Sequence, residues 1–376
     1  MTMMQSLDEK EWKRIPINSV FVIGHGFYNK KPPMSSEGEV PFIGASGINN
    51  GVTGFCTMQA VEDNSKVGYG PNEPIERKLF DKGSICVVNN GSAIGYSYYQ
   101  PKQFTCTHDV NPLTLRDHEM NEDEALFLSQ MIRKQGVCFI YARKWRPSRM
   151  VRSQFLLPVD DDGKPDYGYM AQYASEMRGG MLMRYRNYVA GQLSQLEYKD
   201  IPALDEKEWK EFRIGELFEV SRPKARNKDD YDMGDIPFVA SGAMNNGVMK
   251  CCKTCEGEQL DAGNCITVSP VDGSSFYQPM DFLGRGGAGS SILMLRNNDL
   301  NLFRGEFMAR MIQQTCSKYN YGHMGNKDSI KRERVMLPID EDGKPDYAYM
   351  EQYAKNMMLR KYRQYLTFLQ QRSNAR

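Results

Sequence analysis

The sequence lacks several features that would place it in common classes of protein. No run of about 18 apolar residues occurs, which excludes a membrane-spanning helix. No apolar segment follows the first charged residues, which predicts a cytoplasmic protein without a secretory signal. Positive and negative charges nearly cancel, with 48 basic and 47 acidic side chains. This balance excludes a uniformly basic protein that coats nucleic acid, but it leaves room for a local basic surface.

Motifs that indicate catalysis are also missing. The sequence contains no GxxxxGK[ST] loop and no Asn/Asp-Pro-Pro-aromatic motif, which we would expect in a methyltransferase acting on amino groups of DNA. Its four histidines form no recurring group with Ser, Cys or Asp. One CxxC pair, Cys252 and Cys255, lacks the further ligands of a tetrahedral zinc site. We therefore predict a chain with no catalytic centre, no metal site and no cofactor of its own.

Two further segments are more typical of turns than of ligand sites. The Gly-rich residues 284–291 could hold a phosphate on their backbone amides, although a tight turn between strands is the favoured interpretation. The acidic run at 160–162 recurs at 340–342, and both runs continue into Gly-Lys-Pro-Asp. This pattern predicts a turn that leads into a helix, with Asp166 and Asp346 near the helix N-termini. A metal-binding loop is the less favoured alternative.

An internal repeat organises the whole chain. Three pairs of segments correspond: EWKRIPINSVF (11–21) with EWKEFRIGELF (208–218), VPFIGASGINNGV (40–52) with IPFVASGAMNNGV (236–248), and LPVDDDGKPDYGYMAQYASEM (157–177) with LPIDEDGKPDYAYMEQYAKNM (337–357). Within the last pair, 12 of the 16 positions from 162 to 177 are identical, which excludes chance.

The spacing between the copies shows where they differ. Corresponding residues lie 196 positions apart at Pro41 but 180 apart at Pro158, which leaves 16 extra residues in the first copy. The difference falls between Gly51 and Gly83, opposite the shorter stretch 247–263. This pattern favours two tandem domains with a shared scaffold and different inserts over a solenoid of many short units.

Each copy changes character part-way along. Its first part has short β-branched and aromatic runs between turn signals, which predict strands, as at 84–90 and 264–270. Short helices are expected at 122–135 and 304–315. After the acidic turn the apolar period becomes helical. We predict an α+β fold with these parts: a sheet-based domain at 1–160, a long helix at 161–200, a second sheet-based domain at 201–340 and a second long helix at 341–376.

Each long helix carries one apolar stripe of Met and Tyr. A helix of about 30 residues is about 45 Å long, and a single stripe requires a partner, for which the other long helix is the obvious candidate. Gly179 and Gly180 interrupt the first helix, which a bend or a close helix approach would explain. The predicted pairing residues are Met170, Tyr173, Met177, Met181, Met350, Tyr353, Met357 and Tyr362.

Basic side chains recur at the same place in both copies of this nearly neutral chain. The segment 141–158 holds five cations and no acid, and its Arg152 corresponds to Arg332. We predict two equivalent surfaces that bind phosphates and base edges of DNA, with a solvated basic loop as the alternative for any one residue. The candidate DNA-binding residues are Lys30, Lys31, Arg143, Lys144, Arg146, Arg149, Arg152, Arg222, Lys224, Arg226, Lys318, Tyr319, Lys327, Lys331 and Arg332.

The most regular loop is an Asn-Asn-Gly motif that ends at Gly51 in the first copy and at Gly247 in the second. Asn-Gly favours positive φ, so the first interpretation is a turn of the scaffold. The second interpretation is a DNA contact by one of the asparagines, which are Asn49, Asn50, Asn245 and Asn246.

These features together resemble the specificity subunits of bacterial type I restriction-modification systems. The resemblance covers nearly the whole chain from Trp12 onward. It rests on the E-W-K opening, the P-F-I/V loop with its Asn-Asn-Gly and the D-G-K-P-D-Y-x-Y-M hinge. The hinge and the short helices also resemble the related type IIB systems, in which methylation and cleavage share one partner chain.

The resemblance implies a non-catalytic subunit with two target-recognition domains, each reading one half of a gapped DNA sequence. Its long helices would pair as an antiparallel coiled coil with pseudo-twofold symmetry and dock two methyltransferase, or fused methyltransferase-nuclease, subunits. S-adenosylmethionine would belong to that partner, and a separate restriction subunit is a further expected partner. A spacer of about 45 Å corresponds to about 13 base pairs, and the unequal inserts imply an asymmetric target.

Two other interpretations follow from the residues alone. One is a self-contained metal-dependent endonuclease that holds its metal at Asp160 or Asp340, which the missing nuclease signatures disfavour. The other is a tandem protein- or glycan-binding module that uses Tyr-rich surfaces, which the recurring basic loops disfavour.

Overall fold

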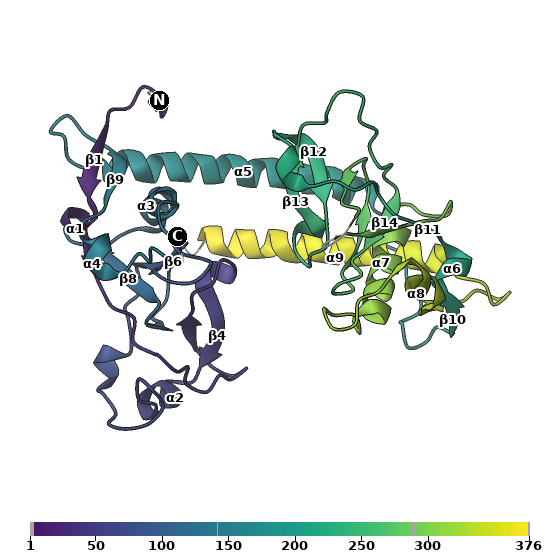
Figure 1. The fold of residues 1–376 in the computed structure, drawn as a ribbon, viewed down its shortest axis with the longest axis horizontal. Helices are drawn as coiled ribbons and strands as arrows, with labels where there is room; N and C mark the ends of the chain where they lie inside the picture. Colours follow the sequence, from purple (N-terminus) through teal and green to yellow (C-terminus); the bar gives the residue numbers. More distant parts are fainter. Residues whose placement is uncertain (1–3, 141, 288–290, 375–376) are drawn as a thin grey trace. The chain divides into compact units, whose positions relative to one another are not determined.

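The computed structural model describes residues 4–140, 142–287 and 291–374. Its contacts divide the chain into two units, Met1–Arg184 and Tyr185–Arg376, whose elements are labelled in Figure 1. The division falls inside the helix α5 (Tyr167–Gln195).

The described part of the first unit contains three small sheets. Its four-stranded sheet has the order β2-β8-β5-β6, and all neighbours run antiparallel. A three-stranded sheet has the order β4-β3-β7, in which β3 and β7 run parallel, and β1 pairs with β9. The bounds are β1 Trp12–Pro16, β2 Phe21–Ile23, β3 Val40–Ile43, β4 Val52–Cys56, β5 Ser84–Val88, β6 Ser97–Gln100, β7 Thr105–Cys106, β8 Val110–Leu115 and β9 Gln154–Pro158.

The second unit repeats this topology strand for strand. Its sheets have the orders β11-β17-β14-β15, β13-β12-β16 and β10-β18, and β12 and β16 again form the parallel pair. The bounds are β10 Trp209–Arg213, β11 Glu219–Ser221, β12 Met233–Val239, β13 Val248–Cys252, β14 Cys265–Val268, β15 Ser275–Gln278, β16 Leu283–Gly284, β17 Leu293–Arg296 and β18 Arg334–Pro338. The prediction of two tandem sheet-based domains of the α+β class is confirmed.

Helices fill the connections between the strands. Those predicted at 122–135 and 304–315 are confirmed as α3 and α7. Among the described helices, none combines the length and the apolar content needed to cross a lipid bilayer. The bounds are α1 Ile17–Val20, α2 Met58–Asp63, α3 Glu122–Gly136, α4 Pro147–Met150, α6 Ile214–Leu217, α7 Leu302–Cys316, α8 Lys327–Arg332 and α9 Tyr347–Asn374, with 3-10 turns at Asn49–Gly51, Ile75–Arg77, Lys228–Asp230 and Asn245–Gly247.

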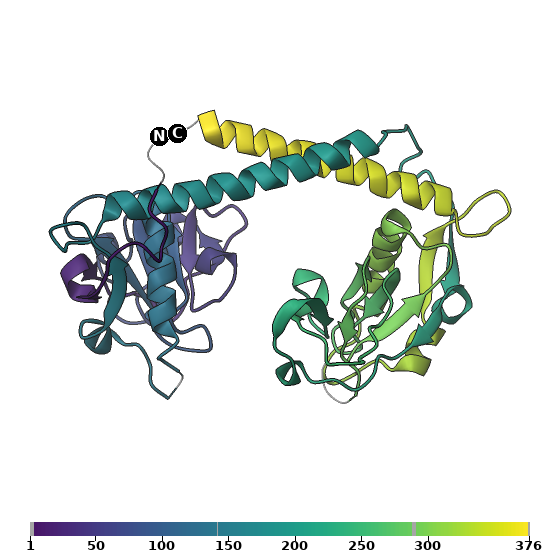
Figure 2. The same cartoon turned by 90° about the horizontal axis from the view of Figure 1, so that it is seen from above.

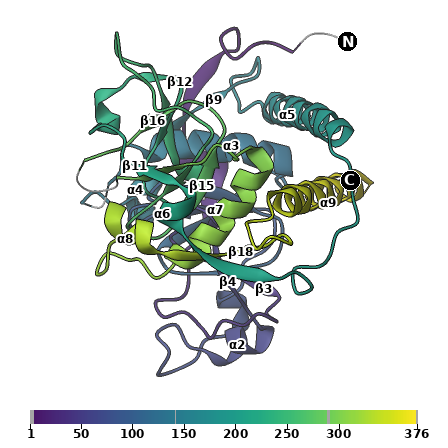
Figure 3. The same cartoon turned by 90° about the vertical axis from the view of Figure 1, so that its right-hand side faces the viewer.

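The largest apolar cluster of each unit lies between its four-stranded sheet, its middle helix (α3 in the first unit, α7 in the second) and the start of its long helix. Smaller clusters include residues of the three-stranded sheets. All five residues of β5 are buried, which matches their continuous apolar run. In the second unit, α7 lies between β15 and α9, as Figure 3 shows. An asparagine N-cap starts each middle helix: Asn121 accepts a hydrogen bond from the backbone of Glu124, and Asn301 accepts two, from Phe303 and Arg304.

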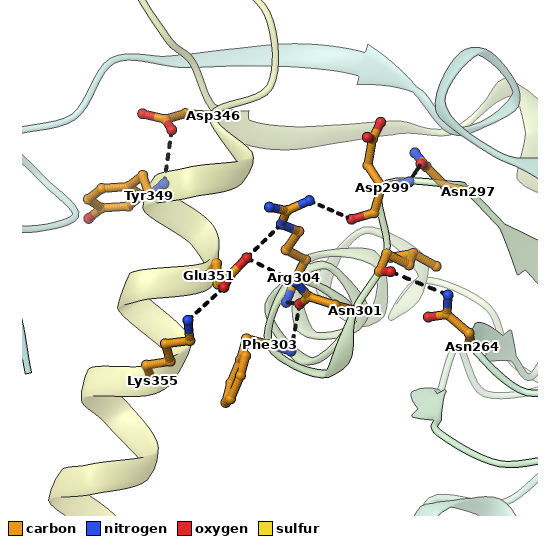
Figure 4. Close-up of polar contacts among 11 residues, drawn as sticks. Asn264, Asn297, Asp299, Asn301, Phe303, Arg304, Asp346, Tyr349, Glu351 and Lys355 are labelled. Atoms are coloured by element: carbon orange, nitrogen blue, oxygen red, sulfur yellow. Dashed lines mark hydrogen bonds and ion pairs between the residues drawn. The ribbon is translucent and has the colours of Figure 1, made fainter. Parts of the chain in front are cut away.

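Polar contacts fix the middle helix of the second unit to α9. The carboxylate of Glu351 accepts hydrogen bonds from Asn301 Nδ2 at 2.9 Å and from Arg304 Nε at 3.0 Å, and Lys355 Nζ lies 2.6 Å away (Figure 4). Because Glu351 lies on α9 and Asn301 caps α7, this carboxylate joins the two helices at the N-terminus of α7.

The first halves of the long helices pack on their own domains. Met170 is fully buried in the core of the first unit, and Tyr173 meets Phe127 edge-on at 5.8 Å. Met350 and Tyr353 occupy the same places in the second unit. The prediction that Met170 and Met350 pair the two long helices is therefore wrong, whereas for the partly buried Tyr173 and Tyr353 it stays a prediction. A periodic stripe shows that a helix face is covered, but it does not show which surface covers it.

Within the second unit, the last turns of α5 contact α9 (Figure 2). Tyr185 packs against Tyr365 with ring centroids 4.9 Å apart, and Tyr188 against Tyr362 at 6.4 Å, both nearly perpendicular. Residue numbers rise along α5 as they fall along α9, so this stretch is antiparallel. It uses the predicted Tyr362. Met177 and Met181 are about half exposed, and pairing along the whole length of the helices stays a prediction.

Candidate nucleic-acid interface

The basic segment of the first unit runs from the end of α3 through α4 to β9. A buried tryptophan holds it in place. The Trp145 ring stacks on Phe139 with centroids 4.8 Å apart, and its Nε1–H donates to Ser153 Oγ at 3.0 Å. Its backbone N–H donates to the carbonyl of Asn89 at the end of β5. The basic side chains around Trp145 are therefore carried by a loop that is anchored to the core.

Those side chains lie on the outside of the loop. Arg143, Arg149 and Arg152 are exposed. The Arg149 guanidinium donates to the carbonyl of Lys144 at 2.8 Å, which holds it close to the loop. Arg146 Nη1 lies 3.7 Å from a carboxylate oxygen of Asp109. The structure brings these five predicted residues together within one short segment, but their contact with DNA stays a prediction.

The equivalent segment of the second unit is built differently. Helix α8 carries Lys327, Lys331 and Arg332, and Asn326 caps its N-terminus. Lys318 Nζ lies 2.6 Å from a carboxylate oxygen of Glu333. These cations therefore share their surface with an acid that has no counterpart in the first unit, where Ser153 occupies the position of Glu333.

Tyr319 departs from its predicted role. Its side chain is 4% exposed, its hydroxyl donates to Glu333 Oε1 at 2.5 Å, and its ring stacks on His323. Burial, together with this hydrogen bond, raises the pKa of Tyr319 to about 12. The structure places this tyrosine inside the domain, where it supports the loop and does not present a surface to DNA.

The remaining predicted DNA-binding residues, which precede these segments in the chain, divide in the same way. Lys30 and Lys31 in the first unit, and Arg222 and Lys224 in the second, are exposed. Arg226 is 8% exposed and lies inside the domain, so the prediction that it binds DNA is wrong.

The guanidinium of Arg226 is fully used by the protein. Its Nε donates to Glu258 and its Nη1 to Asp261, both at 2.7 Å, while Nη1 and Nη2 also reach the carbonyls of Gly284 and Gln259. Sequence reasoning grouped this arginine with its exposed neighbours because charge alone does not show burial. The acids that pair with it lie more than thirty residues further along the chain.

The Asn-Asn-Gly loops adopt the predicted positive φ. The φ angles are 52°, 53° and 77° in the first copy and 50°, 57° and 76° in the second. Asn50 Nδ2 donates to the carbonyl of Tyr99, and Gln100 Nε2 returns a bond to the carbonyl of Asn50. Asn246 and Gln278 repeat both bonds. These bonds tie the three-stranded sheet to the four-stranded sheet, so the scaffold interpretation is confirmed for Asn50 and Asn246.

The acidic hinges serve as turns. Asp160 Oδ1 accepts from the backbone N–H groups of Asp162 and Lys164, and Asp340 does the same in the second unit. Asp166 caps α5 by accepting from Tyr169 N and forms a 2.7 Å ion pair with Lys10; Asp346 and Lys207 repeat this pair at 2.8 Å. Burial is the largest single effect and opposes ionisation of Asp166, but the hydrogen bonds from Lys10 and from the Tyr169 backbone, together with the charge of Lys10, hold the pKa below its usual value.

The Gly-rich stretch 284–291 is described only in part. Part of the Gly-rich stretch, residues 288–290, lies outside the described residues, and the prediction of a turn there stays a prediction. Among described residues, no three His, Cys, Asp or Glu side chains are grouped so that they could hold a metal ion.

Comparison with known proteins identifies the family to which this repeated scaffold belongs. Residues 9–173 and 206–365 each match the type I restriction modification DNA specificity domain. The chain belongs to this family. It is a DNA-specificity subunit of a restriction-modification system, with two target-recognition domains and a non-catalytic role.

Individual relatives are more distant. The type II restriction enzyme BgcI specificity subunit S.BcgI of Heyndrickxia coagulans is 27% identical over 285 residues, which are 75% of this chain and 80% of the relative. The S subunit of a type I system from M. genitalium aligns with 100% of this chain and 97% of its own, at 14% identity and a TM-score of 0.46. The HsdS subunit of Thermoanaerobacter tengcongensis aligns with 94% and 91%, at 13% identity and a TM-score of 0.29.

Proposed function

We propose that this specificity subunit reads an asymmetric, gapped DNA target, one half-site with each domain. The observation that carries the proposal is the repeated scaffold with unlike surfaces. Both units have the same strand order, yet the first carries an insert with helix α2 and the second a short loop that follows β13. Two domains with the same scaffold would approach DNA in the same orientation, whereas their different surfaces would contact different bases.

We further propose that the long helices dock two methyltransferase subunits and that S-adenosylmethionine is bound by those partners in the cytoplasm. The exposed side chains of Met177 and Met181 support this, because apolar side chains on a helix surface favour contact with another protein. Whether the partner is a fused methyltransferase-nuclease or works with a separate restriction subunit depends on other chains. The relative S.BcgI belongs to a type II enzyme, which keeps the type IIB arrangement among the proposals.

A map of DNA methylation in the native host, with and without this gene, tests the proposal. The expected result is that one gapped motif with two different halves loses methylation when the gene is removed. Exchange of residues 40–115 for the corresponding segment of another specificity subunit should change one half of that motif and leave the other half unchanged. A motif with identical halves, or one that changes in both halves, would contradict the proposal.

A further inference from the structure

The two basic loops, which begin after α3 and after α7, differ in how much of their charge is neutralised within the protein. Residues 138–154 contain five cations and no acid, whereas the equivalent residues 318–334 contain five cations and two acids, Asp328 and Glu333. A surface that neutralises DNA phosphates gains affinity from each cation that replaces bound counterions. An acid within the same surface repels phosphate and reduces that gain.

In the first unit, the contacts given for the outward cations are with uncharged groups: Arg149 donates to the carbonyl of Lys144, and Arg143 lies over the Phe139 ring. Among the residues that the structure describes, no acidic side chain lies within 4.0 Å of the charged atoms of Arg143, Arg149 or Arg152. All three are exposed and flank the buried Trp145, which fixes the loop to the core. A guanidinium on an anchored loop loses less conformational entropy when it binds a phosphate than one on a mobile segment.

In the second unit, the cations are partly used by the domain. Lys318 is paired with Glu333 at 2.6 Å, and Arg334 with Glu211 at 3.0 Å. The aliphatic part of Lys331 packs against Gly215 in α6, where a Cβ added to the glycine would lie 3.1 Å from the Lys331 Cβ. The equivalent of Glu211 in the first unit is Arg14, so the first unit has a cation there.

We propose that the first unit's segment Arg143 to Arg152 is the principal phosphate-binding surface of the chain, and that the equivalent segment of the second unit contributes much less electrostatic affinity. The two half-sites are then held unequally. The first domain anchors the protein on DNA largely without regard to sequence, and the second depends more on the contacts that it makes with bases. This inference rests on the proposed function.

The test measures the affinity of the full-length chain for a long duplex of arbitrary sequence as salt is varied, by fluorescence anisotropy. Arg143→Gln/Arg149→Gln/Arg152→Gln removes three cations from the first unit. Its matched control, Lys318→Gln/Lys331→Gln/Arg334→Gln, removes the three cations of the second unit that the domain itself contacts. Each lost phosphate contact lowers the slope of log affinity against log salt by about 0.9. We expect a loss of about 2 to 3 in the first variant and at most about 1 in the control.

A third variant separates charge from folding. Arg143→Lys/Arg149→Lys/Arg152→Lys keeps the charges and should keep most of the slope, whereas a damaged loop would lose it. Equal losses in the two glutamine variants, or a larger loss in the second unit, would overturn the inference while leaving DNA recognition intact. A wild-type chain whose affinity shows no salt dependence would instead overturn the proposed binding of DNA through these surfaces.

Discussion

The two units use the same scaffold but hold their variable segments with different buried cations. In the first unit, Lys78 is fully buried and its ammonium donates to the carbonyls of Val61 and Glu62 and to Asn72 Oδ1, at 2.6 to 3.0 Å. In the second unit, Arg226 forms two ion pairs with carboxylates. The first insert is therefore held by one buried cation with neutral acceptors, and the second by a largely buried network of one cation and two carboxylates.

This difference has a physical consequence for stability. Burial lowers the pKa of Lys78, because its three acceptors carry no full charge and do not replace all of its hydration. The carboxylates of Glu258 and Asp261 compensate for the desolvation of Arg226, whose side chain is 3% exposed. Replacing a buried cation that is held by neutral acceptors should therefore cost less than removing one member of a buried charge network.

The largest expected effect is the loss of the Arg226 network. Arg226→Met leaves two carboxylates at 15% and 13% exposure without their cation, which should lower the free energy of unfolding by about 3 to 5 kcal/mol. Lys78→Met leaves three neutral acceptors unpaired but removes the cost of burying an ammonium, so about 1 to 3 kcal/mol is expected. Urea unfolding measures both losses, and hydrogen exchange assigns them to each unit. Equal losses would show that the Lys78 site and the Arg226 network contribute equally to stability.

Acid should weaken the Arg226 network of the second unit without affecting the Lys78 site of the first unit. Burial alone would raise the pKa of Glu258, but hydrogen bonds from Arg226, Tyr231 and the Cys255 backbone outweigh it, and the pKa lies below its ordinary value of 4.5. A carboxylate with a lowered folded pKa stabilises above its unfolded pKa, and that contribution is lost as pH falls through the folded value. The hydrogen-bond acceptors of Lys78 are two backbone carbonyls and an amide oxygen, so a fall in pH protonates none of them.

Hydrogen exchange at about pH 5 and about pH 3 measures this difference. After correction for the intrinsic exchange rate, residues 255–261 should lose protection at the lower pH, whereas residues 61–78 should change little. The matched variant Glu258→Gln should be less stable at the higher pH and should lose the response. A response of the same size in both segments would mean that general acid unfolding, and not this carboxylate, controls the loop.

The ion pairs between the middle helix and the long helix have opposite polarity in the two units. In the second unit the cation Arg304 lies on α7 and the acid Glu351 on α9. In the first unit the acids Glu122 and Asp123 lie on α3 and the cation Arg178 on α5. Glu351→Gln should cost about 1 to 2 kcal/mol, since three donors converge on it, and Arg178→Gln about 1 kcal/mol, because these side chains are partly solvated.

A charge reversal sharpens this comparison. Arg304→Glu/Glu351→Arg exchanges the signs between α7 and α9 and should recover part of the stability lost by either single change, as a double-mutant cycle in urea would show. Lys355 lies 2.6 Å from Glu351 and would repel the new arginine, so full recovery is not expected. If the stability lost by the double variant equals the sum of the two single losses, the ion pair contributes little.

The repeat, the sheet-based domains and the middle helices could be predicted from the sequence because they depend on local patterns. Strand runs, turn signals and an asparagine before a helix act over a few residues, and all three recur in each copy. The partner of the long helices could not be predicted in the same way. Met170 and Met350 lie on the expected stripe, but domain packing, which is non-local, covers them.

The candidate site shows the same limit. The clustering of cations between 143 and 152 follows from their positions in the sequence, and the structure keeps them together. Arg226 and Tyr319 have the right residue types but are buried, because acids distant in the chain fold over them: Glu258 lies 32 positions after Arg226, and Glu333 lies 14 after Tyr319. The buried role of Lys78 carried no sequence signal, since its acceptors are mainly backbone carbonyls.

The smallest expected effect concerns the glycines of α5. At the positions of Gly179 and Gly180, α9 has Leu359, which is 2% exposed, and Arg360. A Cβ added at either glycine meets no described atom of the first unit within 4 Å, so neither glycine is needed for a close approach within that unit. Gly179→Ala and Gly180→Ala should each stabilise α5 by about 0.5 to 1 kcal/mol, because alanine loses less backbone entropy in a helix.

Hydrogen exchange along residues 175–185 measures this gain, and Leu359→Ala in α9 is the contrasting variant, which should destabilise its helix because it removes a buried side chain. If either glycine variant instead destabilised α5, the helix would depend on a bend there. If stability rose but co-purification with a methyltransferase fell, the bare helix surface at the two glycines would be a place where a partner approaches closely. The contrast between α5 and α9 would then lie in what each helix contacts outside the chain.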